Sequence, residues 1–223
     1  MTEFEPIAPS EFQHADGVAD WRVLSDGANI YFPTASLAES ARLVQAIAEI
    51  PGIDQHPPAI DIREGGVTVR LITFTESFAG LTERDRDIAR QISAAAASFG
   101  LTADPAGVQS LLIVPGAPDI DVVTPFWRAA LGYQPRIDSP REDLVDPRDR
   151  NTPFWFETME EPHPGEGGAI HVAVWVPEEE AEGRVKAALA AGGHVVRDVA
   201  PSWWTLADAA GNEIDISTIA GRG

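Results

Sequence analysis

The sequence predicts an α+β protein built from two compact units. Its 223 residues exceed one average domain, and two units of about 100 residues each fit that length. In the first half, strands with alternating apolar and polar residues come in pairs, and a helix with clear start and stop signals follows each pair, which predicts the order ββαββα. The second half repeats one pattern twice, which predicts two βαβββ modules.

The composition excludes several classes of partner and chemistry. Hydrophobic residues make up 44% of the chain and charged residues 23%, which is enough for ordinary folded cores. Asp and Glu number 35 against 16 Lys and Arg, so the formal net charge is −19. A surface this negative repels phosphate backbones and anionic lipids, and we expect neither nucleic acid nor membrane as a partner. The absence of Cys excludes a disulfide framework, a thiolate metal site and a cysteine nucleophile.

The N-terminal segment shows no periodicity and reads as a partly ordered lead-in over the first 20 residues. Met1–Ser10 is acidic, and no run of about 18 apolar residues occurs in the chain. We therefore expect a cytoplasmic protein.

The first two strands and the first long helix follow this lead-in. Trp21–Leu24 and Asn29–Phe32 flank a Ser-Asp-Gly turn and predict a hairpin. Ser36 can cap a helix whose apolar residues follow the 3.6-residue spacing to Ala48, and Pro51-Gly52 ends it.

A second hairpin and helix complete the first unit. Ala59–Ile62 and Val67–Phe74 flank a Glu-Gly-Gly turn, and the second strand alternates apolar with polar residues as a half-buried strand requires. Thr82–Asp85 has the spacing of a capping box for the helix Glu83–Phe99, which Gly100 ends.

Leu101–Ser110 contains Pro and Gly and is the predicted linker between a domain at residues 1–100 and a domain at residues 111–223. In the second domain, the fragments that begin at Arg128 and Lys186 are similar and lie at equivalent points of the two repeats. The predicted elements are strand Leu111–Val114, helix Ile120–Leu131, strands leading to Pro153–Met159, strand Ile170–Val176, helix Glu178–Ala191, and strands near His194–Val196, Trp203–Leu206 and Glu213–Thr218.

One set of motifs lies in the first unit. Gln55–Pro58 (Gln-His-Pro-Pro) follows a helix, a hairpin leads to Thr73, and Ala79–Asp85 (Ala-Gly-Leu-Thr-Glu-Arg-Asp) opens the next helix. In order and spacing, residues 18–99 resemble the pterin-4a-carbinolamine dehydratase family. The resemblance implies an antiparallel sheet with helices on one face and the dehydration of a 4a-hydroxytetrahydropterin by a histidine cluster, with no cofactor. Loss of the 4a-hydroxyl needs a proton donor at that oxygen and an acceptor for the ring nitrogen's proton, and imidazole titrates near the working pH.

The family residues transfer only in part to this chain. The second His and the Pro of the family's His-His-Pro motif match His56 and Pro57, whereas the first His is Gln55. The acid after Gly-Leu-Thr matches Asp85, although an acid at that position of a helix also stabilises it as a cap, which is the role we favour. His56 could also be a hydrogen-bonded structural histidine, but the motif around it favours a role in the pocket.

The family's third histidine is also replaced. Counting forward from Thr73 places Phe74 at its position, and counting backward from Gly80 places Glu76 there. We expect these two residues to share a strand face, so that a carboxylate could lie near the lost imidazole. The expected catalytic residues are His56, Gln55, Glu76 and Asp85, and the expected substrate-binding residues are Pro57 and Phe74.

The second unit carries motifs of another family. Phe126–Tyr133 (Phe-Trp-Arg-Ala-Ala-Leu-Gly-Tyr) ends the first repeat's helix, and Leu206–Asp215 forms the closing strand. With these motifs, residues 111–220 resemble the glyoxalase-like vicinal oxygen chelate superfamily, whose paired βαβββ modules curl around one site.

In metal-dependent members of that superfamily, the metal acts as a Lewis acid on substrate oxygens. The resemblance implies that His171, Asp215 and Glu157 could hold a divalent cation, although Leu112 occupies the position of the first ligand. The alternative is a metal-free pocket with aromatic walls. We expect Trp175, Trp203 and Trp204 to line it, unless they are core residues.

Together these features predict a fusion that handles a pterin or another small planar molecule. Because two of three family histidines are replaced, we expect any dehydratase (lyase) activity of the first domain to be weakened or lost. The alternatives are a noncatalytic protein that binds or sequesters a small molecule in the glyoxalase-like pocket, and a metal-dependent enzyme of the vicinal oxygen chelate type. Both families commonly self-associate, so we expect a homo-oligomer.

Overall fold

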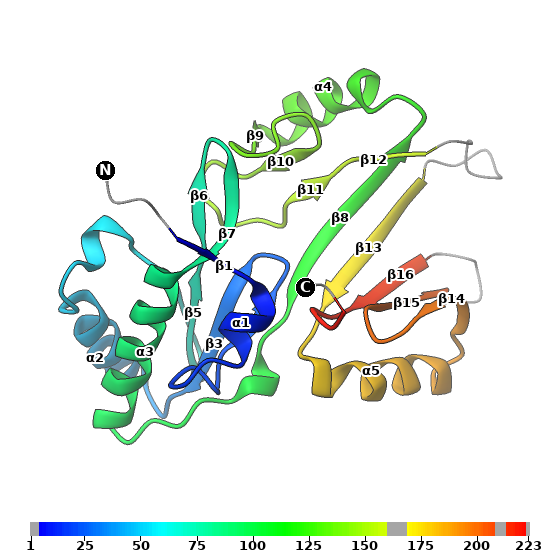
Figure 1. Ribbon diagram of the computed structural model, residues 1–223. Helices are drawn as coiled ribbons and strands as arrows, with labels where there is room; N and C mark the ends of the chain where they lie inside the picture. The colour runs from blue at the N-terminus through cyan, green and yellow to red at the C-terminus, as the bar shows by residue number, and fades with distance from the viewer. Residues whose placement is uncertain (1–4, 160–168, 208–212, 222–223) are drawn as a thin grey trace.

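The computed structural model describes residues 5–159, 169–207 and 213–221. The N-terminal domain, from β1 to α3, contains a sheet with the strand order β2-β3-β5-β4, and all its neighbours are antiparallel. Two long helices, α2 and α3, pack on one face of that sheet (Figure 1). The bounds are β2 Arg22–Leu24, β3 Gly27–Pro33, α2 Leu37–Ala48, the 3-10 turn η1 Ile53–Gln55, β4 Ala59–Arg63, β5 Gly66–Leu71 and α3 Glu83–Ser98.

The core of this domain lies between the sheet and the two helices. Alternate residues of β3 and β5 face the helices, and their cross-strand pairs Ile30 with Val69 and Phe32 with Val67 are almost fully buried. Leu43 of α2 and Ile92 of α3 pack against them. The other residues of the same strands form a polar sheet face, which is turned away from the helices.

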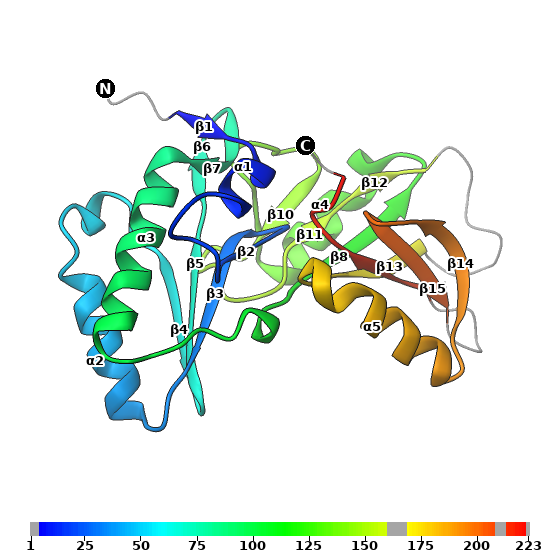
Figure 2. The ribbon, with the colours of Figure 1, turned by 60° about the horizontal axis from the view of Figure 1, so that its bottom comes forward.

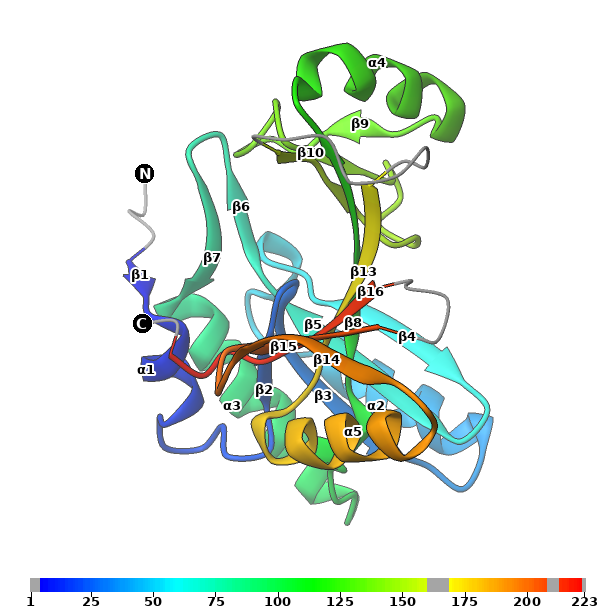
Figure 3. The same cartoon turned by 90° about the vertical axis from the view of Figure 1, so that its right-hand side faces the viewer.

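The segment after β5 differs from the prediction. The expected strand Val67–Phe74 breaks at Ile72, and the chain then forms a second hairpin, β6 Thr73–Thr75 and β7 Phe78–Thr82, whose edge pairs with β1 Pro6–Ile7. The β6–β7 hairpin projects from the domain (Figure 3).

The N-terminal lead-in is ordered over its described part. After β1 it forms the short helix α1 Pro9–Gln13, and Phe12 and Val18 are buried in the domain core. The ring of Phe12 meets Trp21 edge to face with a centroid distance of 6.5 Å. This lead-in therefore belongs to the core, because its few apolar residues pack at the end of the sheet.

The C-terminal domain contains one large sheet with the order β14-β15-β16-β13-β8-β11-β10-β9, in which β12 also pairs with β8. The first module is β8, α4 and β9 to β12, and the second is β13, α5 and β14 to β16. Their first strands, β8 and β13, pair antiparallel at the centre, while each pairs in parallel with a late strand of its own module. This arrangement confirms the predicted paired βαβββ modules.

The bounds in this domain are β8 Ser110–Ala117, α4 Ile120–Leu131, β9 Gln134–Pro135, β10 Asp143–Val145, β11 Phe154–Trp155, β12 Glu157–Thr158, β13 Ala169–Trp175, α5 Glu178–Ala190, β14 His194–Val199, β15 Trp203–Ala207 and β16 Glu213–Ser217. Among the described residues, none of the helices of either domain has the length and apolar character needed to cross a bilayer.

Each helix of this domain covers one face of its module. Alternate residues of the second module, such as Val174 and Ile216, pack against Val185 of α5, and Figure 2 shows α5 running beside β14 and β15. In the first module, Ile120 of α4 packs with Phe154. The residues of opposite parity form the face that we call the open face, which includes Leu112, Ala173, Asp215 and Thr205 in one row across four strands.

The two domains share a small apolar cluster and several polar contacts. Leu24, Val108 and Trp175 are buried together, and Tyr31 and Ile219 pack against them. The polar contacts pair Ser25 Oγ with Ser110 Oγ at 2.8 Å, Arg22 with Glu179 at 2.5 Å, and the guanidinium of Arg70 with Asp149.

Candidate functional site

The N-terminal domain contains a histidine–carboxylate pair. His56 directly follows the turn η1, and Asp85 lies in the first turn of α3. His56 Nε2 lies 2.6 Å from Asp85 Oδ1, and the Asp85 side chain is fully buried. Hydroxyls of Thr73 and Thr82 each donate to Asp85 Oδ2 at 2.7 Å, and the Thr82 amide donates to the same oxygen at 2.8 Å.

Asp85 therefore has two structural duties. The Asp85 carboxylate accepts a hydrogen bond from the Thr82 amide, and the Thr82 hydroxyl accepts one from the Asp85 amide. These two bonds form a capping box at the start of α3. Burial favours a raised pKa for Asp85, but the hydrogen bonds from His56, Thr82 and Thr73 outweigh it and hold the pKa below its ordinary value. The carboxylate is thus ionised at neutral pH and holds Nε2 of His56 in place.

This pair defines what His56 can do chemically. With Nε2 directed at the carboxylate, Nδ1 is the ring atom left for a ligand, and the described residues give it no hydrogen-bond partner. A carboxylate that holds one nitrogen fixes the orientation of the imidazole. The His56 side chain is only 12% exposed, so a ligand must contact the imidazole closely to exchange a proton with it.

The other expected catalytic residues do not converge on His56. Gln55 and Pro57 are exposed beside it, and the structure shows no hydrogen bond from either to the Asp85 network. Glu76 lies in the exposed turn of the β6–β7 hairpin, so the expectation that it shares a strand face with Phe74 is wrong. The reason is that β6 ends at Thr75, one residue before Glu76.

Phe74 lies on the side of β6 opposite to the histidine pair. Its neighbour Thr73 is buried and bonds Asp85, whereas Phe74 is 44% exposed. Successive side chains of a strand point to opposite faces, so Phe74 and His56 are on different sides of the hairpin.

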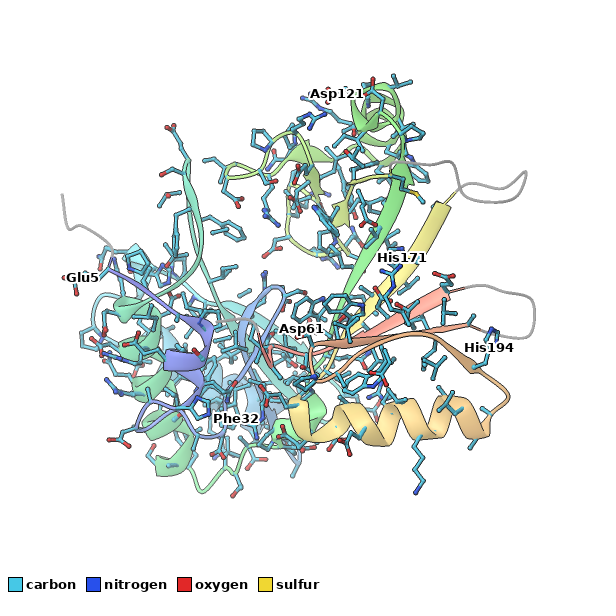
Figure 4. All side chains as sticks on the ribbon, turned by 45° about the vertical axis from the view of Figure 1, so that its right-hand side comes forward. Glu5, Phe32, Asp61, Asp121, His171 and His194 are labelled. Carbon is cyan, nitrogen blue, oxygen red and sulfur yellow. The ribbon has the colours of Figure 1, made fainter. Side chains whose placement is uncertain are left out.

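A second histidine–carboxylate pair lies on the open face of the C-terminal domain. His171 of β13, labelled in Figure 4, has its Nε2 3.4 Å from Asp215 Oδ2 on the neighbouring strand β16. Thr205 donates to the other carboxylate oxygen at 2.7 Å. Asp215 raises the pKa of His171 against the effect of burial, and the pKa of Asp215 is lowered because His171 and Thr205 outweigh its own burial.

The described side chains do not complete a metal site there. Leu112 lies opposite Ala173, and Val114 lies opposite His171 across the β8–β13 pair. Glu157 is exposed on β12, two strand spacings from β13, which puts its backbone about 10 Å from that strand. Across the described residues, no three His, Asp or Glu side chains are grouped to hold an ion. His171 and Asp215 satisfy each other instead.

The three expected pocket tryptophans lie in different places. Trp203 is on the open face, opposite Ser217. Trp204, the next residue, lies on the other face and is buried against α5, so it does not line the pocket. Trp175 is on the open-face side, where it belongs to the cluster between the domains and also lines the cavity of about 810 Å³ that lies between them. Residues at positions 203 and 204 of one strand cannot both face a ligand, because side chains alternate.

Two cavities lie between the domains. One has a volume of about 1250 Å³ and is bounded by the polar sheet face and by the loop 146–151 of the C-terminal domain. The other, of about 810 Å³, lies between the β6–β7 hairpin and the strands β8 to β11, with Phe74 and Trp155 among its walls. Arg70 borders both cavities, and sequence reasoning missed both Arg70 and Trp155. The one available signal was the alternation of side chains along a strand: because Phe154 is buried, Trp155 next to it must point to the opposite face.

Comparison with known proteins identifies the class of each half. The family described as pterin 4 alpha carbinolamine dehydratase matches residues 5–95, and the family described as glyoxalase-like domain matches residues 112–217. The chain is therefore a fusion of a pterin-4a-carbinolamine dehydratase domain with a glyoxalase-like domain, as its motifs indicate.

Two similar solved structures each cover about half of this chain. One described as an NAD-dependent benzaldehyde dehydrogenase from Legionella pneumophila is 14% identical, with a TM-score of 0.37, and covers 48% of this chain and 97% of its own. A glyoxalase/bleomycin resistance protein/dioxygenase superfamily member from Vibrio splendidus 12B01 is 16% identical, with a TM-score of 0.33, and covers 50% and 99%. No curated protein matches the sequence. These likenesses are too distant to transfer a function.

Proposed function

We propose that the protein handles a pterin or a similar small planar molecule in the cytoplasm, and that its first domain has a weakened 4a-hydroxytetrahydropterin dehydratase activity that depends on His56. The observation that carries the proposal is the 2.6 Å contact between His56 and the buried Asp85, which keeps one acid–base group of the family's cluster in place. Self-association, common in both families, is part of the same proposal.

In the proposed reaction, His56 Nδ1 gives a proton to the 4a-hydroxyl, which leaves as water, while the ring nitrogen loses its proton to solvent. Asp85 holds the imidazole in position for this transfer. One positioned acid or base contributes roughly 10²–10⁴-fold to a rate, and Gln55 and Glu76 do not supply the missing groups. The activity is therefore far below that of an enzyme with three histidines.

The test is the dehydration rate of a synthetic 4a-hydroxytetrahydropterin with full-length protein. We expect a small acceleration that His56→Ala abolishes. His14→Ala is the matched control, since His14 lies at the end of α1 with its Nδ1 bonded to the Ser10 carbonyl, and this variant should keep the wild-type rate. A rate unchanged by His56→Ala would remove His56 from the mechanism.

A second candidate function is noncatalytic binding of a small molecule by the glyoxalase-like domain. The observation that favours it is the 810 Å³ cavity against β8 and β11, a volume typical of ligand pockets. A protein that binds a ligand stoichiometrically without turning it over, and whose binding survives His56→Ala, would support this candidate over the dehydratase.

The metal-dependent alternative fits the described side chains poorly, because His171 is paired with Asp215 and Glu157 lies apart. Elemental analysis of untagged protein is the direct check. Stoichiometric transition metal that is lost in His171→Ala would restore this alternative.

A further inference from the structure

The 810 Å³ cavity between the domains, which we call the interdomain chamber, lies apart from the His56–Asp85 pair. Its first wall is the outward side of the β6–β7 hairpin, with Phe74, and its second wall comes from the open face, with Leu112 and Trp155. Since Thr73 and Phe74 point to opposite sides of β6, a ligand in the chamber does not reach His56.

The chamber has aromatic surface from both domains. Phe74, on the projecting β6–β7 hairpin, is 44% exposed, and Trp155 is half-buried. Phe154, just before Trp155, is buried under α4, which leaves Trp155 facing away from that core. Aromatic rings that line a cavity offer faces on which a flat ligand can stack.

The charges of the chamber are predominantly negative. Its lining includes three guanidinium groups and five carboxylates, which belong to Arg70, Arg136, Arg150, Asp26, Asp138, Glu142, Asp143 and Asp149.

Two of the guanidinium groups are already neutralised. Arg136 pairs with Asp138 at 2.7 Å and with Asp143 at 2.9 Å, and Arg70 pairs with Asp149. Arg70 also lies 3.8 Å from Asp26. Burial raises the pKa of both Asp143 and Asp26, which works against their ionisation. Counted as charged groups, the five carboxylates still exceed the three guanidinium groups, and this excess favours a cation over an anion.

Resting on the second candidate function, small-molecule binding in this same cavity, we propose that the interdomain chamber is a binding site for a flat aromatic cation, which stacks on Phe74 and Trp155 and is neutralised by the surplus carboxylates. An aromatic face attracts a cation and the carboxylates add to that attraction, so both features select the same chemistry. The volume of about 810 Å³ accommodates a ligand of two or three fused rings.

The test uses proflavine, a flat tricyclic cation, as the probe with full-length protein at 0.15 M and 0.5 M salt. We expect saturable binding of one molecule per chain, measured by fluorescence polarisation, that persists at the higher salt. Phe74→Ala should weaken it about tenfold, which is the size expected for a desolvated cation–aromatic contact. Trp155→Leu should weaken it to a similar extent, and Glu142→Gln by a smaller factor.

The controls separate the chamber from other surfaces. Phe99→Ala removes a ring of nearly equal exposure, 45%, at the end of α3, and His56→Ala removes the other site. Both variants should bind proflavine like the wild type, and the anionic dye ANS should not compete.

Equal affinity of Phe74→Ala and wild type, competition by ANS, or no saturable binding would each overturn the proposal. If Trp155→Leu does not fold, the affinity of Phe74→Ala for proflavine decides the result, because Phe74 is exposed and its replacement should not disturb folding. Loss of binding in His56→Ala alone would assign the probe to the histidine pair and leave the proposed dehydratase untouched.

Discussion

Replacing Asp85 by Asn tests the central interaction of the N-terminal domain. The carboxylate is fully buried and accepts four hydrogen bonds, three of them on Oδ2. Hydrogen bonds to a charged group contribute about 1.5–3 kcal/mol each, and neutral ones about 0.5–1.5 kcal/mol. An Asn that keeps its carbonyl toward the three donors loses about 1 kcal/mol per bond, so we expect Asp85→Asn to lower the free energy of unfolding by about 3 kcal/mol.

The assay is urea unfolding followed by circular dichroism, together with hydrogen exchange of the amides of α3. Asp87→Asn is the control, because Asp87 lies two residues further on the same helix, has a 65% exposed side chain and pairs with Arg90 only at the surface. We expect this control to stay within about 0.5 kcal/mol of the wild type. A loss below 1 kcal/mol in Asp85→Asn, or equal losses in both variants, would refute the reasoning.

The effect of Asp85→Asn on stability should depend on pH. The folded-state pKa of Asp85 lies below its ordinary value, so its contribution to stability is complete above the unfolded-state pKa of about 3.9 and is lost as the pH falls through the lower folded value. The ionisation of Asp85 should therefore make the difference in stability between wild type and Asp85→Asn narrow as the pH falls below about 4. A difference that grows as the pH falls below about 4 would contradict the assigned direction.

Three further predictions concern other parts of the chain. Gly27 has φ +118°, and a Cβ there would lie 2.3 Å from the Leu71 carbonyl oxygen, so Gly27→Ala should cost more than about 2 kcal/mol in urea unfolding, and a neutral result would contradict the backbone clash. Asp215→Asn should lower the pKa of His171 in an NMR titration, because that carboxylate is the main cause of its raised pKa. In the wild type, the stabilisation from this pair is complete below the ordinary histidine pKa of about 6.5 and is lost as the pH rises through the raised value. An unchanged His171 titration in Asp215→Asn would show that Asp215 does not raise this pKa. A cut between the domains should leave both halves folded but expose Trp175 to solvent, with a red-shifted emission; an insoluble half would show that the interface is essential for folding.

Local signals predicted much of the secondary structure. The cap Ser36 and the stop at Pro51-Gly52 predicted α2 with the bounds that the structure has, and Gly132 did so for α4. Thr82–Asp85 predicted the start of α3, where the capping box is present. Capping chemistry involves residues three or four positions apart, so it can be read without knowledge of the fold.

Contacts between distant residues could not be predicted in this way. The β6–β7 hairpin turns at Glu76-Ser77, which lacks the Gly or Asn that marks most tight turns, so the extra strands gave no signal. The pairing of Arg70 with Asp149 joins residues 79 positions apart, and it depends on how the two domains meet. The interdomain chamber was missed for the same reason, whereas the link between His56 and Asp85 was accessible through the family motif.

The double duty of Asp85 bears on how such a fusion can diverge. Gln55 is exposed, so exchanging a histidine for glutamine there alters proton transfer and leaves folding nearly untouched. A substitution of Asp85 would remove the capping box and destabilise the start of α3, even in a chain that no longer catalyses the reaction. Selection for a folded domain alone is therefore enough to retain this aspartate, and its presence in a relative is poor evidence of enzymatic activity. The exposed position 55, which fold stability does not protect, is the better record of whether a lineage still performs the reaction.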